Sequence, residues 1–466
     1  MSKKYKILFL IILFLSIGLR IGLVSVNREA NDPHDEVITY IIENNALPEK
    51  DDCWECFQPK LFHYTTAKIL QIPLLEEART DQSDMVLQLE IINLIASIFI
   101  LITIAVFIHQ LPVGNENLKL ISFALVALNP KLIGINAQFT NDTFAILFSS
   151  LALYFTSRYL MKQKWSLFLL MIVFTILGIS TKTNVWVIAI AIFMSLLVKA
   201  WTGKEKFMRI FLIAMLYAIS TLTISTLNPL NQYIHNMKEH DAPVLLNMEK
   251  KEFPNYFHKT EVGRPGILSI YDGFFSFRYF DLLQHPLIEV GESYTPTRTS
   301  LWTMLYARTH SLHFSNYPET WAAEGEKGFN LSRAIFIFAL PPTILILFGF
   351  LLEIFYTLKS FFKRDKNLSS NHLDGLSAIT FFGYVSFIII YALSYRDFSV
   401  MKPVFMYPAI LFLPVFFMRT VEFIRSWLGK RFQWMKTIFV VWMGILFVLY
   451  TVEVMTMIEL ISSRMV

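Results

Sequence analysis

The densest group of residues able to do chemistry follows the first long apolar run of the chain. Asp32, His34, Asp35 and Glu36 lie within five residues of one another. A carboxylate held at a membrane surface can act as a general base towards an acceptor hydroxyl. The same spacing also suits a solvated acidic turn, or an N-cap at Asp35 for a short helix that follows it. Asp35 and Glu36 are therefore the candidate catalytic pair, and His34 is a candidate pocket residue.

A second polar stretch farther along the same segment combines an amide with aromatic rings. Gln58 and Pro59 precede a cluster that ends at Tyr64. Amide groups and aromatic faces suit a sugar-sized pocket, whereas a belt of interfacial aromatic residues is the common alternative. Cys53 and Cys56 in this stretch either pair with each other on an oxidising face or remain two thiols.

Three positively charged residues occupy short connections that face away from the basic loops of the chain. Lys182 joins two apolar segments, and Arg396 and Lys402 lie in a second connection. Such cations suit a clamp for a phosphate group. The alternatives are that they reach phosphates of the outer leaflet, or that Arg396 pairs locally with Asp397. Asp142, which begins an apolar segment on the same side, is either a helix N-cap or another site residue.

The composition assigns these residues to a membrane protein. Of 466 residues, 55% are hydrophobic and only 17% are charged, and the mean hydropathy is +0.49. A soluble domain has ~25% charged residues, so the surplus of apolar side chains needs lipid to face. The net charge of +5 comes largely from basic clusters between apolar runs, which indicates topology rather than nucleic-acid binding.

The apolar runs predict an all-α polytopic membrane protein with about 11 transmembrane helices, since ~20 apolar residues cross the hydrocarbon core. The predicted spans are Ile7–Val26, Met85–Ile108, Leu118–Ile135, Asp142–Leu160, Trp165–Ser180, Val185–Lys199, Phe207–Leu227, Ala334–Tyr356, Leu376–Tyr395, Val404–Met418 and Thr437–Glu459. Basic clusters fall in every second connection, which predicts that the amino terminus is cytoplasmic. Arg20 and Glu90, inside the first two spans, are expected to form an ion pair.

Two long outer loops follow from this topology, at residues 27–84 and 228–332. The apolar spacing in Val37–Ile42 and Leu61–Leu70 predicts short amphipathic helices on the membrane surface. We expect a transmembrane core of residues 1–418 that includes both loops. Residues 419–466 are then a cytoplasmic connector and the last transmembrane helix.

The order and sidedness of these motifs resemble the C-type glycosyltransferase superfamily. The nearest member is glycosyltransferase family 39, the protein O-mannosyltransferase and aminoarabinose-transferase-like family. The resemblance rests on Asp35-Glu36, the segment Gln58 to Tyr64, Asn129-Pro130, Asn141-Asp142, Thr181-Lys182, and the stretch from Lys402 through Tyr407-Pro408. It extends to about Met418. The chain departs from the pattern where Lys60 replaces a second proline, and where the ring that follows the acidic pair comes late, at Tyr40.

This resemblance implies a glycosyltransferase that moves a hexosyl or pentosyl unit from a polyprenyl-phosphate donor to an acceptor hydroxyl. Transfer would occur on the non-cytoplasmic face, with inversion at the anomeric carbon. Asp35 would be the general base, assisted by Glu36. The lipid phosphate would be held by Lys182, Arg396 and Lys402. The substrate pocket would include His34, Gln58, Pro59, Tyr64, Asp142 and Tyr407.

The implied partners are membrane lipid, the lipid-linked sugar donor, and an acceptor protein, lipid or polysaccharide, in a bacterial inner membrane. A flippase or transporter of lipid-linked glycans is the main alternative, and a non-catalytic scaffold is the second. Few charges lie at mid-membrane, which disfavours a proton-coupled transporter. The sequence has no metal-ligand spacing, Walker loop or dinucleotide fingerprint, so neither a metal site nor a nucleotide cofactor is predicted.

Overall fold

The computed structural model is a bundle of helices that describes most of the chain. It describes residues 2–28, 33–72, 82–203, 207–245, 270–286, 300–312, 322, 325–395, 402–429 and 432–463. Within these ranges the secondary structure is helical, with no strand. The prediction of an all-α protein is therefore confirmed. Arg396 and Asp32, two residues singled out by the sequence, lie outside the described ranges.

The bundle contains nine helices in the described residues that are long and apolar enough to cross a membrane, or up to ten if one bent pair counts as a span. These spans contain the helices α1 (Lys3–Val26), α4 (Gln82–Gln110), α7 (Asp142–Lys162), α9 (Trp186–Thr202), α10 (Phe207–Leu227), α15 (Lys327–Lys363), α17 (Leu376–Tyr395), α18 (Leu413–Leu428) and α19 (Phe432–Ser462), and α9, α17 and α18 each continue a 3₁₀ helix that belongs to the same span. The bent pair is α5 (Glu116–Ala127) with α6 (Pro130–Asn136), which meet at 52°. The shorter apolar helix α8 (Trp165–Thr181) has 17 residues. Each predicted span thus coincides with a helix, or with two helices in tandem.

Two predicted boundaries differ from the structure. Helix α15 has 37 residues, so it extends beyond the predicted span Ala334–Tyr356 at both ends. Helix α18 follows the 3₁₀ helix η9 (Pro403–Phe412) and continues to Leu428, so residue 418 lies inside it. The division of the chain at residue 418 stays a prediction.

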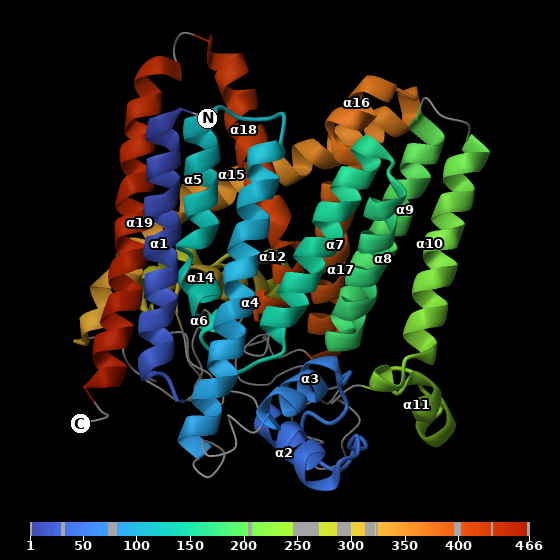
Figure 1. Ribbon diagram of the computed structural model, residues 1–466. Helices are drawn as coiled ribbons and strands as arrows, with labels where there is room; N and C mark the ends of the chain where they lie inside the picture. The colour runs from blue at the N-terminus through green and yellow to red at the C-terminus, as the bar shows by residue number, and fades with distance from the viewer. Residues whose placement is uncertain are drawn as a thin grey trace.

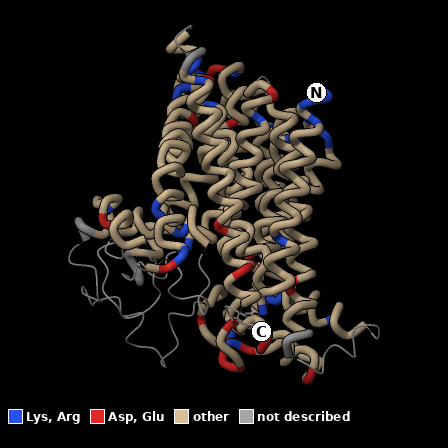
Figure 2. Tube along the Cα trace, turned by 90° about the vertical axis from the view of Figure 1, so that its left-hand side faces the viewer, with Lys and Arg blue, Asp and Glu red and all other residues tan. Residues whose placement is uncertain are grey.

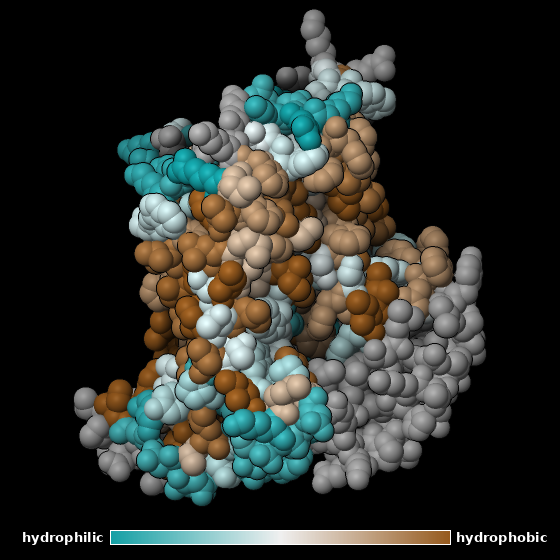
Figure 3. All heavy atoms as spheres, turned by 90° about the vertical axis from the view of Figure 1, so that its right-hand side faces the viewer, coloured by the Kyte–Doolittle hydropathy of each residue, from teal (hydrophilic) through white to brown (hydrophobic). Residues whose placement is uncertain are grey.

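One face of the bundle is apolar between two hydrophilic ends (Figure 3), and large apolar side chains are exposed along the long helices. Large side chains such as Phe14, Leu169 and Leu351 are more than half exposed there. Lys, Arg, Asp and Glu gather mainly at the two ends, and few lie between them (Figure 2). Such a belt requires lipid to cover it, because exposing it to water would be costly. The protein is therefore a multi-pass membrane protein.

One close approach brings the backbones of α15 and α18 together. A Cβ atom added to Gly349 would lie 2.0 Å from the carbonyl oxygen of Phe416. Only glycine lets the two helices meet at this distance.

Helix α15 also contains Pro341 and Pro342. A proline has no N–H for the carbonyl four residues earlier, which for Pro342 is that of Phe338. The indole Nε1 of Trp442 on α19 donates to this carbonyl at 2.9 Å.

The ends of the bundle differ in what they carry (Figure 1). The amino terminus and α16 (Lys366–Asn371) lie at one end, called here the amino-terminal end. Helices α2 (His34–Asn44), α3 (Leu61–Leu70) and α11 (Tyr233–His240) lie at the opposite end, called the loop end. Helices α2 and α3 confirm the two predicted short helices. They pack against each other through Val37, Ile38, Ile41 and Phe62, which are all buried.

The expected ion pair between Arg20 and Glu90 does not form. Arg20 Nη1 donates to the carbonyl oxygens of Ser16 and Ala127, each at 3.1 Å. Glu90 instead accepts from Asn27 Nδ2 at 2.9 Å. Because α5 ends at Ala127, the carbonyl of that residue is available to accept a hydrogen bond from the Arg20 guanidinium.

Candidate functional site

The acidic pair lies in the first turn of α2. The N-cap of this helix is Pro33, so the alternative that Asp35 caps it is wrong. Asp35 is partly exposed and Glu36 is exposed. Both carboxylates stand in the first turn, near the positive end of the helix dipole, where negative side chains stabilise a helix. Glu36 Oε2 also accepts from the backbone N–H of Trp54 at 3.4 Å.

A histidine pair anchors the start of α2. The rings of His34 and His63 are buried and joined by a hydrogen bond of 3.0 Å between Nδ1 and Nε2. Burial, the nearby His34 ring and the Lys60 ammonium hold the pKa of His63 well below its usual range. The ring of His34 also meets that of Phe139 edge-on, with centroids 6.1 Å apart. Asp35, the residue after His34, is thereby attached to the loop that precedes α7.

The loop between α2 and α3 is held by its own contacts. Cys53 and Cys56 form a disulfide, so the paired alternative holds. Lys60 is fully buried, its ammonium donates to the carbonyl of Cys56, and its backbone N–H donates to Leu230 O at 2.7 Å. Gln58 Nε2 donates to the carboxylate of Glu55. Lys60, where the resemblance would place a second proline, therefore fixes the loop by bonds that a proline cannot make.

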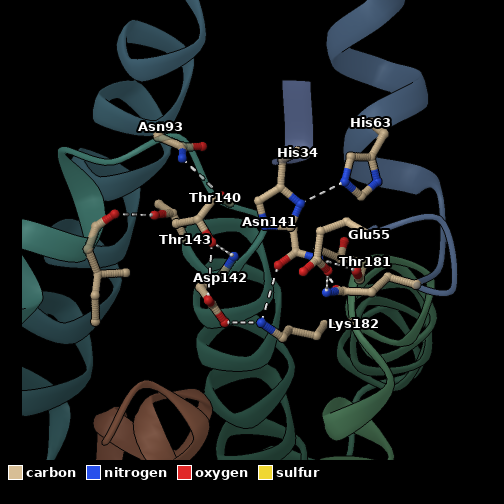
Figure 4. Close-up of polar contacts among 12 residues, drawn as sticks. His34, Glu55, His63, Asn93, Thr140, Asn141, Asp142, Thr143, Thr181 and Lys182 are labelled. Carbon is tan, nitrogen blue, oxygen red and sulfur yellow. Dashed lines mark hydrogen bonds and ion pairs between the residues drawn. The ribbon is translucent and has the colours of Figure 1, made fainter. Parts of the chain in front are cut away.

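Asn141 connects this loop to the helix bundle (Figure 4). Its Nδ2 donates to Gln58 Oε1 and, at 3.4 Å, to the carbonyl of Thr181. Its Oδ1 accepts from Lys182 Nζ at 3.3 Å. Gln58, Asn141 and Lys182 come from three distant parts of the chain, so the fold brings together three of the elements that the sequence singled out.

Asp142 and Lys182 form an ion pair at the centre of this network (Figure 4). Lys182 Nζ lies 2.6 Å from Asp142 Oδ1, and the two side chains are 14% and 11% exposed. Asp142 Oδ2 accepts from Thr140 Oγ1 at 3.1 Å. Asn141 occupies the N-cap position of α7, so Asp142 is not the cap and its carboxylate is turned to Lys182.

The segment that follows Lys402 lies next to this pair. Lys182 Nζ is 5.9 Å from the ring centroid of Phe405, in the first turn of η9. Phe405 N donates to Lys402 O at 3.2 Å. The second loop with predicted cations therefore ends beside the first. Arg396, the third cation, lies outside the described residues.

Three predicted pocket residues stand apart from the network. Tyr64 is 38% exposed on α3, with Lys68 Nζ 5.5 Å from its ring centroid. Tyr407 is buried in η9, where its hydroxyl donates to Asn129 Oδ1 at 3.3 Å. Pro59 is buried two residues before α3 begins. Their place in a substrate pocket stays a prediction.

Sequence reasoning did not identify His63 as the partner of His34, nor the buried group around His310. His310 Nδ1 is 2.5 Å from the Tyr450 hydroxyl, and Nε2 is 2.7 Å from Thr343 Oγ1. These bonds fix α14 (Leu301–His310) against α15 and α19. No spacing in the sequence links residues so far apart. His63, by contrast, lies on the inner face of a predicted helix, which is a signal that could have been used.

The side chains of this site are of the types that bind polar or anionic groups. The site offers a paired ammonium and carboxylate, two side-chain amides and a hydroxyl, with a partly exposed carboxylate on the neighbouring helix. Among the described residues, no group of three metal-ligating side chains is present.

Comparison with known proteins extends this description. Residues 85–225 match the family model described as dolichyl-phosphate-mannose-protein mannosyltransferase. The match runs from α4 to α10 and includes Asn141, Asp142 and Lys182. It confirms, over this segment, the resemblance to C-type glycosyltransferases. No curated protein matches the chain.

Solved structures of an oligosaccharyltransferase from Archaeoglobus fulgidus share the fold. The apo form has a TM-score of 0.52 and 14% identity, over 97% of this chain and 56% of the other. The form tethered to an acceptor peptide with the NVT sequon has a TM-score of 0.51 and 12% identity, over 97% and 55%. The chain thus spans about half the length of these relatives, and at such identity the likeness is one of fold.

Proposed function

We propose that this chain is a membrane glycosyltransferase that moves a sugar from a polyprenyl-phosphate donor to an acceptor hydroxyl. The observation that carries the proposal is the meeting of Lys182, Asp142 and the segment after Lys402 at the loop end. The family match in residues 85–225 supports it, because that description names a lipid-phosphate sugar as donor and a protein as acceptor.

The reaction is an inverting displacement at the anomeric carbon. The Asp35 carboxylate removes the proton of the acceptor hydroxyl as its oxygen attacks. The bond between the anomeric carbon and the phosphate oxygen breaks, and polyprenyl phosphate leaves with the electron pair. Glu36, whose carboxylate is held by the Trp54 N–H, orients the acceptor.

The cations act on the leaving group. Negative charge grows on the lipid phosphate as the bond breaks, and fixed positive groups stabilise that transition state. Lys182, Lys402 and Arg396 have this role in the proposal. Lys182 is already neutralised by Asp142 in the structure, so the phosphate must compete with that carboxylate. In the proposal Asn141 Oδ1, once Lys182 turns to the phosphate, accepts from a sugar hydroxyl, while Nδ2 stays bonded to Gln58.

The proposal includes the orientation in the membrane. The amino terminus faces the cytoplasm and the loop end faces the outside, as in a bacterial inner membrane. The disulfide between Cys53 and Cys56 supports this orientation, because disulfides persist on oxidising faces. The acceptor, whether protein, lipid or polysaccharide, therefore approaches from outside.

The decisive experiment compares envelope glycans from cells that lack the protein and carry either the wild type or a variant. Asp35→Asn keeps the size of the side chain but removes the base, so the sugar should stay missing. Glu43→Gln is the matched control, since Glu43 is an exposed carboxylate on the same helix. If Asp35→Asn, inserted at wild-type level, restores the sugar, Asp35 is not the base.

The same experiment separates the enzyme from a flippase of lipid-linked glycans. A flippase breaks no glycosidic bond, so it should be insensitive to Asp35→Asn. Deletion of a flippase should also leave the lipid-linked glycan on the cytoplasmic side. A transferase that is deleted should instead leave the lipid-linked sugar on the outer side, uncleaved.

A further inference from the structure

A groove of about 420 Å³ opens at the amino-terminal end of the bundle, far from the site described above. It lies where the start of α5, the last turns of α18 and the start of α19 come together. The candidate span Pro403–Leu428 ends at this level, and the candidate span Met435–Ser462 begins there. The groove therefore stands at the depth of lipid headgroups.

The outer level of the groove is polar and basic. Arg425 in the last turn of α18 and Lys436 at the start of α19 line it, and both are exposed. Asn117 on α5 completes this level. The carboxylate in the lining, Glu422, accepts from the backbone N–H of Gly114 at 2.7 Å. The lining thus carries two cations and one carboxylate, and that carboxylate already accepts a hydrogen bond from Gly114.

The inner level is mostly apolar, with Glu422 beside Val421 as its one carboxylate in the lining. One turn deeper than the polar residues, α5 contributes Ile121, α18 contributes Val421, and α19 contributes Phe439 and Val440. Asn117, Arg425 and Lys436 are thus followed by apolar side chains one turn deeper, and Glu422 is already bonded to Gly114, so the groove is amphipathic. A ligand that fits it has an anionic group at one end and a hydrocarbon chain at the other.

We propose that this groove binds an anionic glycerophospholipid from the leaflet at the amino-terminal end. Its phosphate lies between Arg425 and Lys436, and the start of an acyl chain lies on Phe439, Val440 and Ile121. Basic pockets between transmembrane helices are suited to anionic headgroups, and an arginine can hold phosphate oxygens by two parallel bonds. This site is independent of the proposed sugar transfer.

The test is native mass spectrometry of the full chain in detergent, titrated with phosphatidylglycerol or with phosphatidylcholine of the same acyl chains. The wild type should retain one phosphatidylglycerol under conditions that strip phosphatidylcholine. Arg425→Gln with Lys436→Gln should weaken this retention about tenfold or more, because each surface cation contributes to anionic lipid binding. Arg425→Lys with Lys436→Arg keeps the charges and should keep the lipid.

The matched control is Lys162→Gln with Lys359→Gln, which removes two exposed cations near the same end of the bundle, outside the groove. This control should retain phosphatidylglycerol as the wild type does. Glycerol 3-phosphate should displace the lipid poorly, since it lacks the chain that the apolar level holds. Equal retention of the two lipids, or equal loss in the groove variant and the control, would overturn the proposal. Displacement by glycerol 3-phosphate alone would reduce the site to a phosphate site.

Discussion

Lys182 and Asp142 form an ion pair that has a close counterpart at the other end of the bundle. Lys199 Nζ lies 3.4 Å from Asp374 Oδ2, and those side chains are 12% and 5% exposed. The two pairs are similar in burial, yet the first lies at the loop end, where Asn141 links it to Gln58 in the loop between α2 and α3. The second pair is enclosed by helix ends, where Lys199 also donates to Leu160 O at 2.6 Å. This contrast gives a test of function against stability.

Lys182→Gln should lower sugar transfer per folded molecule by about 10²-fold, the usual cost of losing one group that stabilises developing charge. Lys199→Gln should leave transfer per folded molecule unchanged. Both variants should lower the thermal stability in detergent, because each leaves a buried carboxylate without its cation. If the two variants lose transfer activity equally per folded molecule, the Lys182 pair has only a structural role.

The histidine pair predicts a dependence of stability on acid. The pKa of His63 is lowered in the folded protein, so the unfolded chain binds its proton at a higher pH than the native one. The stability that the neutral ring contributes is therefore complete above pH ~6.5, the ordinary pKa of histidine, and is lost as the pH falls below it. His63→Gln should flatten the decline of the melting temperature below that pH. His109→Gln, at an exposed position, should not change the decline.

A third prediction concerns the contact between α15 and α18. Gly349→Ala places a Cβ atom against the Phe416 carbonyl, so the two helices must separate and the melting temperature should fall by several degrees. Gly444→Ala on α19 is the control, since its Cβ would meet no atom within 4 Å. That variant should be neutral or slightly stabilising, because alanine favours a helix. Equal melting temperatures for the two variants would contradict the close approach.

The disulfide allows a test of sidedness in intact cells. A membrane-impermeant maleimide should label Cys53 and Cys56 only after treatment with an impermeant reductant. No other cysteine is present in the sequence, so every label reports this loop. A Cys53→Ser, Cys56→Ser variant gives the background. Labelling that requires broken membranes would place residues 53–56 in the cytosol and exclude the proposed orientation.

Much of the fold could be predicted from the sequence because apolar length and loop charge are local properties. The helices α2 and α3 also followed from local spacing. The extents of α15 and of α18 could not be predicted, since both helices continue into polar sequence that has no membrane signal. Tertiary packing, rather than hydropathy, sets those ends.

The candidate site was predictable in its residue types and not in its bonds. Lys182 and Asp142 were assigned separate roles, whereas they form one ion pair. Arg20 and Glu90 were expected to pair, and each has another partner. In both cases the outcome depends on which helices are neighbours, and one sequence does not contain that information. The disulfide was left open for the same kind of reason, because the redox face is not a local property.

The carbonyl of Phe338, released by Pro342 and bound by Trp442, has a consequence for motion in this protein. A proline in a long helix usually creates a hinge. Here the Phe338 carbonyl is bound by Trp442 of α19, inside the membrane, where water does not supply a substitute donor. Bending α15 at this point would require the bond between Trp442 and Phe338 to break, so α15 and α19 should move together as one rigid unit. Trp442→Phe, which keeps the ring but removes the donor, would release the hinge.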